Sequence, residues 1–295
     1  MLQEAGRQEL VTVQQICGAV LENYPDVEQD FILGLRQPTN SLQEKGEQIL
    51  KQYGYDEEHL LADNTLYAAY NSDDNYAPYL GASMLSLLQS NTSFSRICIY
   101  IMDCGMTEES RCNLQRIAAQ FGREIFFVLM QQHIAQLDLH LGAHKMAVAA
   151  YARLFLTQVL PEDCSRVLYI DCDTIVKGSL AEIWKLPFGN ALIAGVQDTV
   201  DNYFLDAIGL EKGLPYINAG ILLVNLEAWR KENLLAQFLG VIRRFDGNVP
   251  AHDKGTINAV CGARRIVLPV RYNLTSNLYS FSAKTIRRIY FLDSF

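Results

Sequence analysis

The alternation of short apolar runs with turns and helical stretches, which begins at Leu66, constrains the fold of this chain more than any other feature. Strands that alternate with helices predict βαβ units, so we expect an α/β protein with a mostly parallel central sheet flanked by helices. In such sheets ligands bind beyond the carboxyl ends of the strands, and the polar residues after each run are therefore the first place to look for chemistry. The runs are Leu66–Tyr70, Ile97–Met102, Ile125–Leu129, Val167–Ile170, Leu192–Val196 and Gly220–Asn225.

The first part of the chain differs in charge from the rest. Residues 1–63 hold 4 Lys+Arg and 12 Asp+Glu, whereas residues 64–295 hold 21 of each, so the first segment carries the whole net charge of −8. Apolar residues recur at helical spacing between Leu10 and Tyr24, and Ser41 with Glu44 has the form of a capping box. We predict a small acidic helical module at 1–63, whose apolar stripe packs internally or docks a protein partner, and one larger domain at 64–295.

The composition argues against several classes of protein. With 49% hydrophobic residues the chain can build a core without disulfides or a structural metal, and its seven cysteines form no CxxC pair. The chain starts without signal-peptide features, and no apolar stretch approaches the roughly 18 residues of a membrane span. We expect a cytoplasmic protein with reduced thiols and at most peripheral membrane contact, in which the N-x-[ST] matches at Asn91 and Asn273 carry no weight. The acidic balance argues against nucleic acid as a partner.

Two carboxylates, Asp171 and Asp173, directly follow the apolar run Val167–Ile170. A strand end fixes the direction of both side chains, and carboxylate oxygens are the ligands that Mg²⁺ and Mn²⁺ prefer. A divalent ion held there would bridge a diphosphate and neutralise charge as the bond to the leaving group breaks. The alternative is a pair of aspartates in an ordinary turn, which the apolar strand before the pair and the apolar residues after it disfavour.

A second polar segment follows the run Leu66–Tyr70 and includes Asn71, Asp73, Asn75 and Tyr76. A carboxylate and an amide accept from and donate to the edge of a pyrimidine, while a tyrosine ring offers a face on which the base stacks. Taken alone, the segment is equally typical of a solvated turn.

Four stretches of the sequence resemble glycosyltransferase family 8, the retaining transferases that include bacterial lipopolysaccharide glucosyl- and galactosyltransferases and glycogenin. They are AAYNSDDNYAPYLGASMLSLL at 68–88, AAYARLFLTQVLPEDCSRVLYIDCDTIVKGSLAEIW at 149–184, YINAGILLVNLEAWR at 216–230 and HDKGTINAV at 252–260. The resemblance runs in order from about Leu66 to Tyr279, roughly 70% of the chain.

This resemblance implies a GT-A-type nucleotide-diphospho-sugar transferase domain. Such a domain would move a hexose from UDP-glucose or UDP-galactose to a saccharide or glycolipid acceptor, with retention and with Mn²⁺ or Mg²⁺ bound. The resemblance implies that Asp73 and Asn75 contact uracil, that Arg153 lies near the diphosphate, and that Asp171 and Asp173 hold the metal. The residues implied at the donor sugar, the acceptor and the reacting bond are Asp198, Asn218, Gly220, Asp253 and Lys254. The same motifs add Asn71, Cys172 and Ala219 to the expected nucleotide-sugar site.

The sequence departs from the family pattern at two places. Family members usually carry Asp-Gln where this chain has Asp253 and Lys254, and a lysine there sets a cation beside an oxocarbenium-like centre. The reaction should slow unless Lys254 is deprotonated, turned away or paired with Asp253; otherwise it is an exposed lysine at a helix start. The family's late His-x-x-Gly-x-x-Lys-Pro-Trp segment, which supplies a third metal ligand, does not occur before Phe295, so we expect a shortened chain or weakened metal binding.

Two alternatives remain open from the sequence. In a haloacid-dehalogenase-type phosphatase, Asp171 would attack phosphate and Asp173 would act as acid and base. That motif normally opens its domain, whereas here a complete strand and turn precede it. In a non-catalytic protein, the fold would bind a UDP-sugar without turnover because of Lys254 and the missing segment.

Overall fold

The computed structural model describes residues 64–135, 149–199, 202–211, 213–276, 278, 281–282 and 284–285. The chain divides into two units, one made of Glu57–Ser280 and the other of Met1–Asp56 with Phe281–Phe295. The predicted helical module at 1–63 lies outside the described residues. The architecture below is that of the unit Glu57–Ser280.

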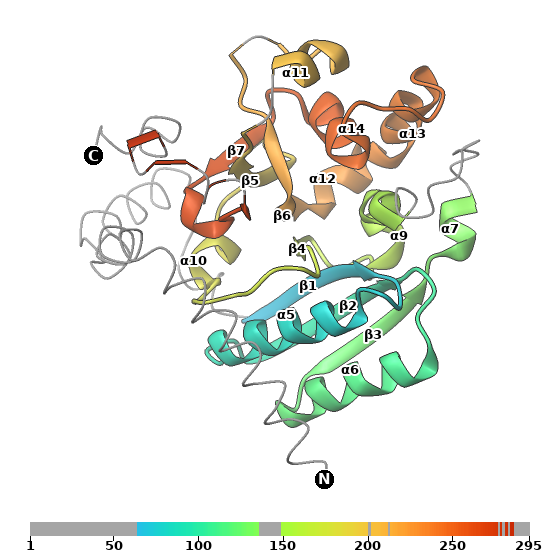
Figure 1. The fold of residues 1–295 in the computed structure, drawn as a ribbon, viewed down its shortest axis with the longest axis vertical. Helices are drawn as coiled ribbons and strands as arrows, with labels where there is room; N and C mark the ends of the chain where they lie inside the picture. Colours follow the sequence, from blue (N-terminus) through green and yellow to red (C-terminus); the bar gives the residue numbers. More distant parts are fainter. Residues whose placement is uncertain are drawn as a thin grey trace. The chain divides into compact units, whose positions relative to one another are not determined.

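A seven-stranded sheet with the order β3-β2-β1-β4-β6-β5-β7 forms the centre of this unit (Figure 1). Every strand runs in the same direction except β6, which is antiparallel to β4 and to β5. The prediction of an α/β protein with a mostly parallel sheet is therefore confirmed. The strands are β1 (Thr65–Ser72), β2 (Arg96–Asp103), β3 (Glu124–Leu129), β4 (Arg166–Ile170), β5 (Ile193–Gln197), β6 (Ile217–Asn225) and β7 (Arg265–Leu268).

The six predicted runs match six of these strands, and the sequence analysis missed only β7 among the described strands. β7 contains three apolar residues between Arg265 and Pro269, and most of it is only partly buried. Such a short, half-exposed edge strand has too little apolar pattern to stand out from a loop.

The reversed direction of β6 brings its beginning to the carboxyl edge of the parallel strands. Ile170, the last residue of β4, lies opposite Ile221 of β6, and the next backbone hydrogen bond joins the amide of Asp171 to the carbonyl of Gly220 at 2.7 Å. The residues before Ile221 therefore lie beside the residues that follow β4. Two segments separated by about 50 residues in sequence meet at one edge of the sheet.

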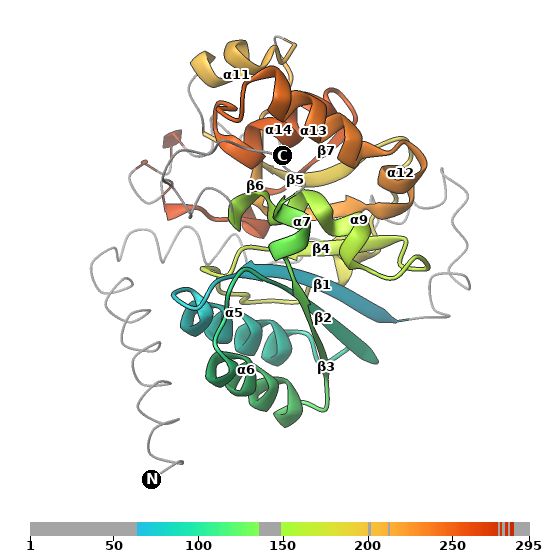
Figure 2. The same ribbon diagram turned by 90° about the vertical axis from the view of Figure 1, so that its right-hand side faces the viewer.

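Helices α5 (Ala77–Ser90) and α6 (Glu108–Gln120) pack side by side over the β1–β3 part of the sheet (Figure 2). Helix α6 begins at a defined cap, because the Thr107 hydroxyl accepts a hydrogen bond from the amide of Ser110 at 3.2 Å. Two acidic residues in its first turn add a favourable interaction with the helix dipole. Because α5 follows β1 and α6 follows β2, both helices start at the carboxyl edge of the sheet, and they cover the same face.

A large core cluster lies between the sheet and helices that come later in the chain. It includes the buried aromatic side chains of Tyr151, Phe155, Tyr169, Trp229 and Phe238. Burying a side chain of this size stabilises a fold by roughly 1.5–3 kcal/mol. The remaining described helices, not all of which contribute to this cluster, are α7 (Gln131–Ala135), the 3₁₀ helix η1 (Tyr151–Phe155), α9 (Leu156–Val159), α10 (Ala181–Trp184), α11 (Asn202–Ile208), α12 (Leu226–Lys231), α13 (Leu234–Arg244), α14 (His252–Cys261) and the 3₁₀ helix η2 (Val270–Tyr272).

Among the described residues, no helix is both long enough and apolar enough to cross a membrane.

Candidate functional site

Arg153 joins three segments of the predicted site. Its Nη2 lies 2.9 Å from Oδ1 of Asp171, its Nε lies 3.0 Å from Oδ2 of Asp253, and its Nη1 donates to the carbonyl of Ala219 at 2.6 Å. These partners come from the end of β4, the start of α14 and the start of β6. One guanidinium group thus holds together residues that are far apart in sequence.

Arg153 is buried in η1, with 8% of its side chain exposed. Its guanidinium carbon lies 4.3 Å from the centre of the Tyr169 ring, a favourable cation–π arrangement. Burial opposes the positive charge, but Asp171 and Asp253 outweigh it, so the pKa of Arg153 lies above its ordinary value. Each of the three guanidinium nitrogens has an acceptor, and the single N–H of Nε is shared between Asp253 and the carbonyl of Ala150.

Asp171 and Asp173 follow β4 and differ in their surroundings. Asp171 is 32% exposed, and its Oδ1 accepts hydrogen bonds from the Tyr169 hydroxyl at 2.8 Å and from Arg153. Asp173 is more exposed. Partial desolvation of the Asp173 carboxyl, and then the negative charge of Asp171, raise its pKa. The negative charges of these two neighbouring carboxylates favour the binding of a cation between them and solvent.

Cys172 and Gly220 complete the surroundings of Asp171. The Cys172 side chain is half-buried, and desolvation followed by the charges of Asp171 and Asp173 raises its thiol pKa to about 12. This thiol is therefore neutral. A Cβ atom at Gly220 would come within 3.0 Å of Asp171 Oδ2 and of Asn218 Oδ1, so the absence of a side chain there leaves room beside Oδ2.

Asp198 and Lys254 form an ion pair in a second part of the site. Lys254 Nζ lies 2.6 Å from Oδ2 of Asp198, whose side chain is only 5% exposed. Asn218 Nδ2 donates to the same oxygen at 3.1 Å, and the amide of Thr199 donates to Oδ1. The sequence analysis had left open a pairing of Lys254 with Asp253; Lys254 instead pairs with Asp198, and Asp253 pairs with Arg153.

Asp253 is buried at the start of α14 and faces two charged groups. Desolvation raises its pKa, Arg153 lowers it, and Asp171 raises it again, with a net shift upwards. Backbone amides at the helix start also stabilise the ionised form. The ion pair with Arg153 therefore offsets only part of the cost of burying this carboxylate.

The residues after β1 divide into two groups. Asn71 belongs to the Arg153 cluster, because its Oδ1 accepts from the Tyr169 hydroxyl and its Nδ2 donates to the carbonyl of Ala149 at 3.2 Å. Asp73 Oδ1 accepts from the amide of Tyr76 at 3.0 Å, and Asn75 is exposed. Among the described residues, no hydrogen bond or ion pair joins Asp73 or Asn75 to Asp171.

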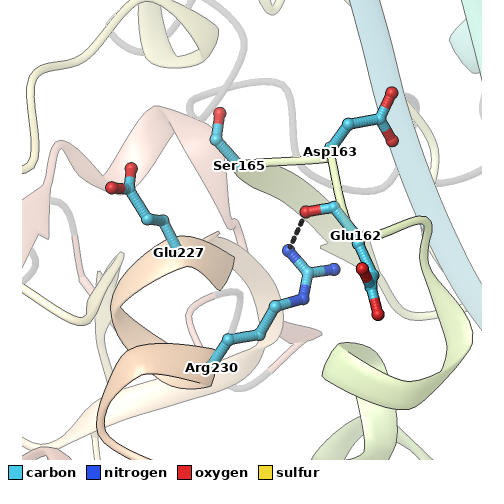
Figure 3. Close-up of a pocket in the computed structure, with 5 residues that line it drawn as sticks. All are labelled: Glu162, Asp163, Ser165, Glu227 and Arg230. Carbon is cyan, nitrogen blue, oxygen red and sulfur yellow. Dashed lines mark hydrogen bonds between the residues drawn. The ribbon is translucent and has the colours of Figure 1, made fainter.

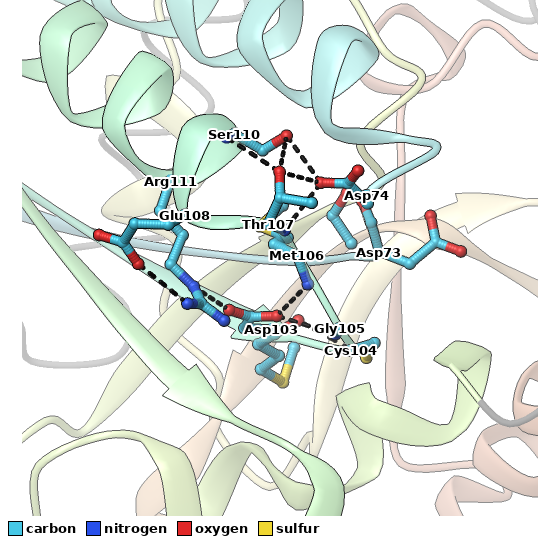
Figure 4. Close-up of polar contacts among 12 residues, drawn as sticks. Asp73, Asp74, Asp103, Cys104, Gly105, Met106, Thr107, Glu108, Ser110 and Arg111 are labelled. Carbon is cyan, nitrogen blue, oxygen red and sulfur yellow. Dashed lines mark hydrogen bonds and ion pairs between the residues drawn. The ribbon is translucent and has the colours of Figure 1, made fainter.

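Asp74 anchors the turn that carries Asp73 and Asn75. Its Oδ1 accepts from the amide of Thr107 at 2.8 Å, from the Thr107 hydroxyl at 2.8 Å and from the Ser110 hydroxyl at 2.7 Å (Figure 4). The backbone bond from Thr107, followed by the two hydroxyl bonds, lowers the pKa of Asp74. The turn after β1 is thus tied to the start of α6.

Asp103, at the end of β2, fixes the neighbouring loop in the same region (Figure 4). Its Oδ1 accepts from the amides of Gly105 and Met106, and its Oδ2 lies 2.6 Å from Nε of Arg111. Asp103 directly follows the apolar run Ile97–Met102, which is where a polar residue near a ligand is expected, but it belongs to no recognised motif. The sequence analysis therefore missed it together with Asp74.

Two further residues were missed, Tyr169 and Asn273. Tyr169 stands two residues before Asp171, and the alternation of side chains along a strand places both on one face of the sheet, a signal that could have found it. Asn273 Nδ2 donates to Asn218 Oδ1 at 2.8 Å. Its only local signal is the N-x-T match, which says nothing about this contact.

The donor set at Asp171 and Asp173 fits a divalent cation. Among the described residues no group of three or more His, Cys, Asp or Glu side chains is arranged to hold a metal ion. Mg²⁺ and similar ions are nevertheless commonly held by one or two carboxylates together with substrate phosphates and water. The two carboxylates therefore suit an ion that arrives with a phosphorylated ligand.

A surface pocket at the opposite end of β4 contains none of the predicted site residues. Arg230 donates from Nη1 to the carbonyls of Glu162 and Cys164, and the other lining residues are Asp163, Ser165 and Glu227 (Figure 3). Ser165 precedes β4 whereas Asp171 follows it, so the strand separates this pocket from the carboxylate pair. The pocket has an acidic rim, and Arg230 Nε is buried without a hydrogen-bond partner among the described residues.

The first N-x-[ST] match, Asn91, has a structural role. The six described cysteines, which are all but Cys17, are free thiols. Asn91 is fully buried; its Nδ2 donates to the carbonyl of Leu87 and its Oδ1 accepts from the amide of Leu180.

Several proteins that are similar to this chain in sequence or in fold are named as glycosyltransferases. The model of the family described as "Glycosyl transferase family 8" matches residues 68–290. A Haemophilus influenzae protein provisionally named a glycosyltransferase is 29% identical over 72% of this chain, which spans 64% of that relative's length. The lipopolysaccharide 1,3-galactosyltransferase of Salmonella typhimurium is 26% identical over 59% of this chain and 52% of its own. The crystal structure of the galactosyltransferase LgtC with donor and acceptor sugar analogues has a TM-score of 0.64 at 25% identity, covering 74% of this chain and 78% of that one.

Proposed function

Because the chain belongs to glycosyl transferase family 8, we propose that it transfers a hexose from a UDP-sugar to a hydroxyl acceptor, with retention of configuration and with Mn²⁺ or Mg²⁺ bound. The observation that carries this proposal is the meeting of Asp171, Arg153 and Asp253 at the carboxyl edge of the sheet, beside the Gly220 backbone. This edge is where open α/β sheets bind their ligands.

The donor in this proposal is UDP-glucose or UDP-galactose. The relatives named for lipopolysaccharide glucosyl and galactosyl transfer support this choice, as does the solved galactosyltransferase bound to a donor analogue. A saccharide or glycolipid serves as the acceptor. Asp73 and Asn75 would receive the uracil, since the turn that carries them is anchored through Asp74.

The diphosphate would lie against Asp171 and Asp173, which hold the divalent ion. When bound, this ion neutralises the charge that develops on the departing diphosphate. Arg153 holds Asp171 and Asp253 in position, and these contacts leave one N–H on each of its two terminal nitrogens for the diphosphate. Asp198 and Asn218, which are hydrogen-bonded to each other, would orient the hexose hydroxyls.

Lys254 favours a second candidate, a protein that binds a UDP-sugar without turnover. In wild-type protein its ammonium is paired with Asp198, so its charge beside the sugar is largely offset. If the pair opens when the donor binds, a cation would face the oxocarbenium-like centre and slow transfer. A variant with an amide in its place, Lys254→Gln, separates the candidates: it gains transfer activity if Lys254 blocks turnover.

Release of UDP from UDP-glucose and from UDP-galactose, measured with and without Mn²⁺, tests the proposal directly. We expect metal-dependent release in the wild type, a loss of at least about 100-fold in Asp173→Asn, and no change in Asp163→Asn, at the other end of β4. NMR of the product then reports the anomeric configuration. If neither UDP-hexose is cleaved with Mn²⁺ or Mg²⁺, while calorimetry shows UDP binding, the binding-protein candidate replaces the transferase.

The phosphatase alternative has no support from the comparisons, since the family match is to glycosyl transferases. A cytoplasmic location, contact with the inner face of a membrane and a protein partner for residues 1–63 stay predictions.

A further inference from the structure

Tyr169 is a fully buried residue of β4 whose hydroxyl contacts two residues of the candidate site. It lies 2.8 Å from Oδ1 of Asp171 and also donates to Oδ1 of Asn71, in the neighbouring strand β1. A hydroxyl carries one proton, so it serves these two acceptors in turn. Tyr169 therefore connects the end of β1 with the end of β4.

The hydrogen bonds of Asp171 distinguish its two carboxylate oxygens. Oδ1 accepts from Tyr169 and, at 2.9 Å, from Nη2 of Arg153. In the described part of the chain, no donor reaches Oδ2, which instead faces the space that Gly220 leaves open. One oxygen is thus held by the protein, and the other is presented at a partly exposed surface.

We propose that Tyr169 is a positioning residue that orients the Asp171 carboxylate so that Oδ2 faces the divalent cation. The proposal rests on the proposed function, because it takes Asp171 as a ligand of that cation. Hydrogen-bond partners of metal ligands fix the ligand's orientation, and their removal typically weakens metal affinity 10–100-fold. Without the hydroxyl, the Asp171 side chain would keep only the Arg153 contact and could rotate about it.

A phenylalanine isolates this role, because it keeps the buried ring and its contact with Arg153. The matched control is Tyr70→Phe: Tyr70 is equally buried, in the adjacent strand β1, and its hydroxyl accepts from Ser83 at 3.4 Å without touching Asp171. Both variants lose one buried hydroxyl. Only Tyr169→Phe loses a bond to a proposed metal ligand.

The test is Mn²⁺ binding, followed by the loss of the free-ion electron paramagnetic resonance signal, to full-length protein saturated with UDP. We expect the Mn²⁺ Kd to rise about 10-fold or more in Tyr169→Phe and to stay within about 2-fold of wild type in Tyr70→Phe. Thermal unfolding of the metal-free proteins, expected to be similar for the two variants, separates positioning from a loss of stability.

Two results would overturn the proposal in distinguishable ways. If the wild type binds Mn²⁺ with UDP and Tyr169→Phe binds it equally well, or is weakened no more than Tyr70→Phe, Tyr169 does not position the ligand although the metal site exists. If the wild type and both variants bind no Mn²⁺, the metal site itself fails and the inference falls with it.

Discussion

The ammonium of Lys254 lies 2.6 Å from the carboxylate of Asp198, a partner 56 residues earlier in the chain. The lysine side chain is 28% exposed, whereas that of Asp198 is almost fully buried. An unpaired carboxylate at such a depth would be costly, so the lysine has a structural role whatever its effect on the reaction.

Lys254→Met should therefore destabilise the protein by about 1–3 kcal/mol at pH 7, because Asp198 loses its cation but keeps its bonds to Asn218 and Thr199. Urea unfolding measures the loss. The control is Lys231→Met, an exposed lysine on α12, for which we expect a change within about 0.5 kcal/mol. Equal losses in the two variants would show that the ion pair does not stabilise the fold.

The fold was predictable from local patterns, but the partners within the site were only partly so. The six apolar runs were each long enough to mark a strand, and the aspartates after β4 and the Asn218–Gly220 segment were identified from motifs. The three states considered for Lys254 did not include its actual partner, because β5 and α14 are brought together by the fold and not by any local spacing. The contact between Asn273 and Asn218 joins residues 55 apart in the sequence, so no local pattern could have predicted it either.

A second expected outcome concerns pH and Asp253. Its folded-state pKa lies above the ordinary value of about 3.8, so the favourable contribution of this group is complete below about pH 4 and is lost as pH rises through the raised pKa. Asp253→Asn does not titrate. The unfolding free energy of the variant minus that of wild type should therefore increase from pH 4.5 to pH 7, with Asp163→Asn as the control for losing one charge. A difference that falls with pH would mean that the Arg153 pair outweighs desolvation.

A third prediction concerns the space beside Asp171. In Gly220→Ala the new methyl group would lie 3.0 Å from Asp171 Oδ2 and from Asn218 Oδ1, so one of these side chains must move. We expect at least about 10-fold weaker binding of UDP with Mn²⁺ by calorimetry, since shifted ligands lose their geometry. The control is Gly178→Ala, where the added atom meets nothing within 4 Å. Unchanged binding by Gly220→Ala would place the cation away from Oδ2.

A fourth prediction concerns the anchor of the turn after β1. Asp74→Ala removes three hydrogen bonds to Thr107 and Ser110, which frees the turn that carries Asp73 and Asn75. If uracil binds at this turn, the affinity for uridine, which lacks the diphosphate, should fall about 10-fold or more in calorimetry. Asp74→Asn keeps an acceptor oxygen and should retain more of the affinity. Equal uridine binding by wild type and Asp74→Ala would exclude this turn as the uracil site.

The last prediction uses two helical glycines that differ only in their surroundings. A Cβ atom at Gly255, in the first turn of α14, would lie 1.9 Å from the carbonyl oxygen of Pro250, which is backbone and cannot swing aside. Relief requires α14 to move, together with Asp253 and Lys254 at its start. At Gly240, in α13, an added Cβ meets nothing within 4 Å.

Gly255→Ala should therefore cost at least about 3 kcal/mol of unfolding free energy, because overpacking against backbone cannot relax through a rotamer change. Gly240→Ala should instead stabilise by about 0.5–1 kcal/mol, since alanine loses less backbone entropy in a helix. Urea unfolding of both variants beside wild type gives the comparison. A folded Gly255→Ala protein as stable as Gly240→Ala would mean that α14 does not lie this close to Pro250, and the positions of Asp253 and Lys254 would then have to be redrawn.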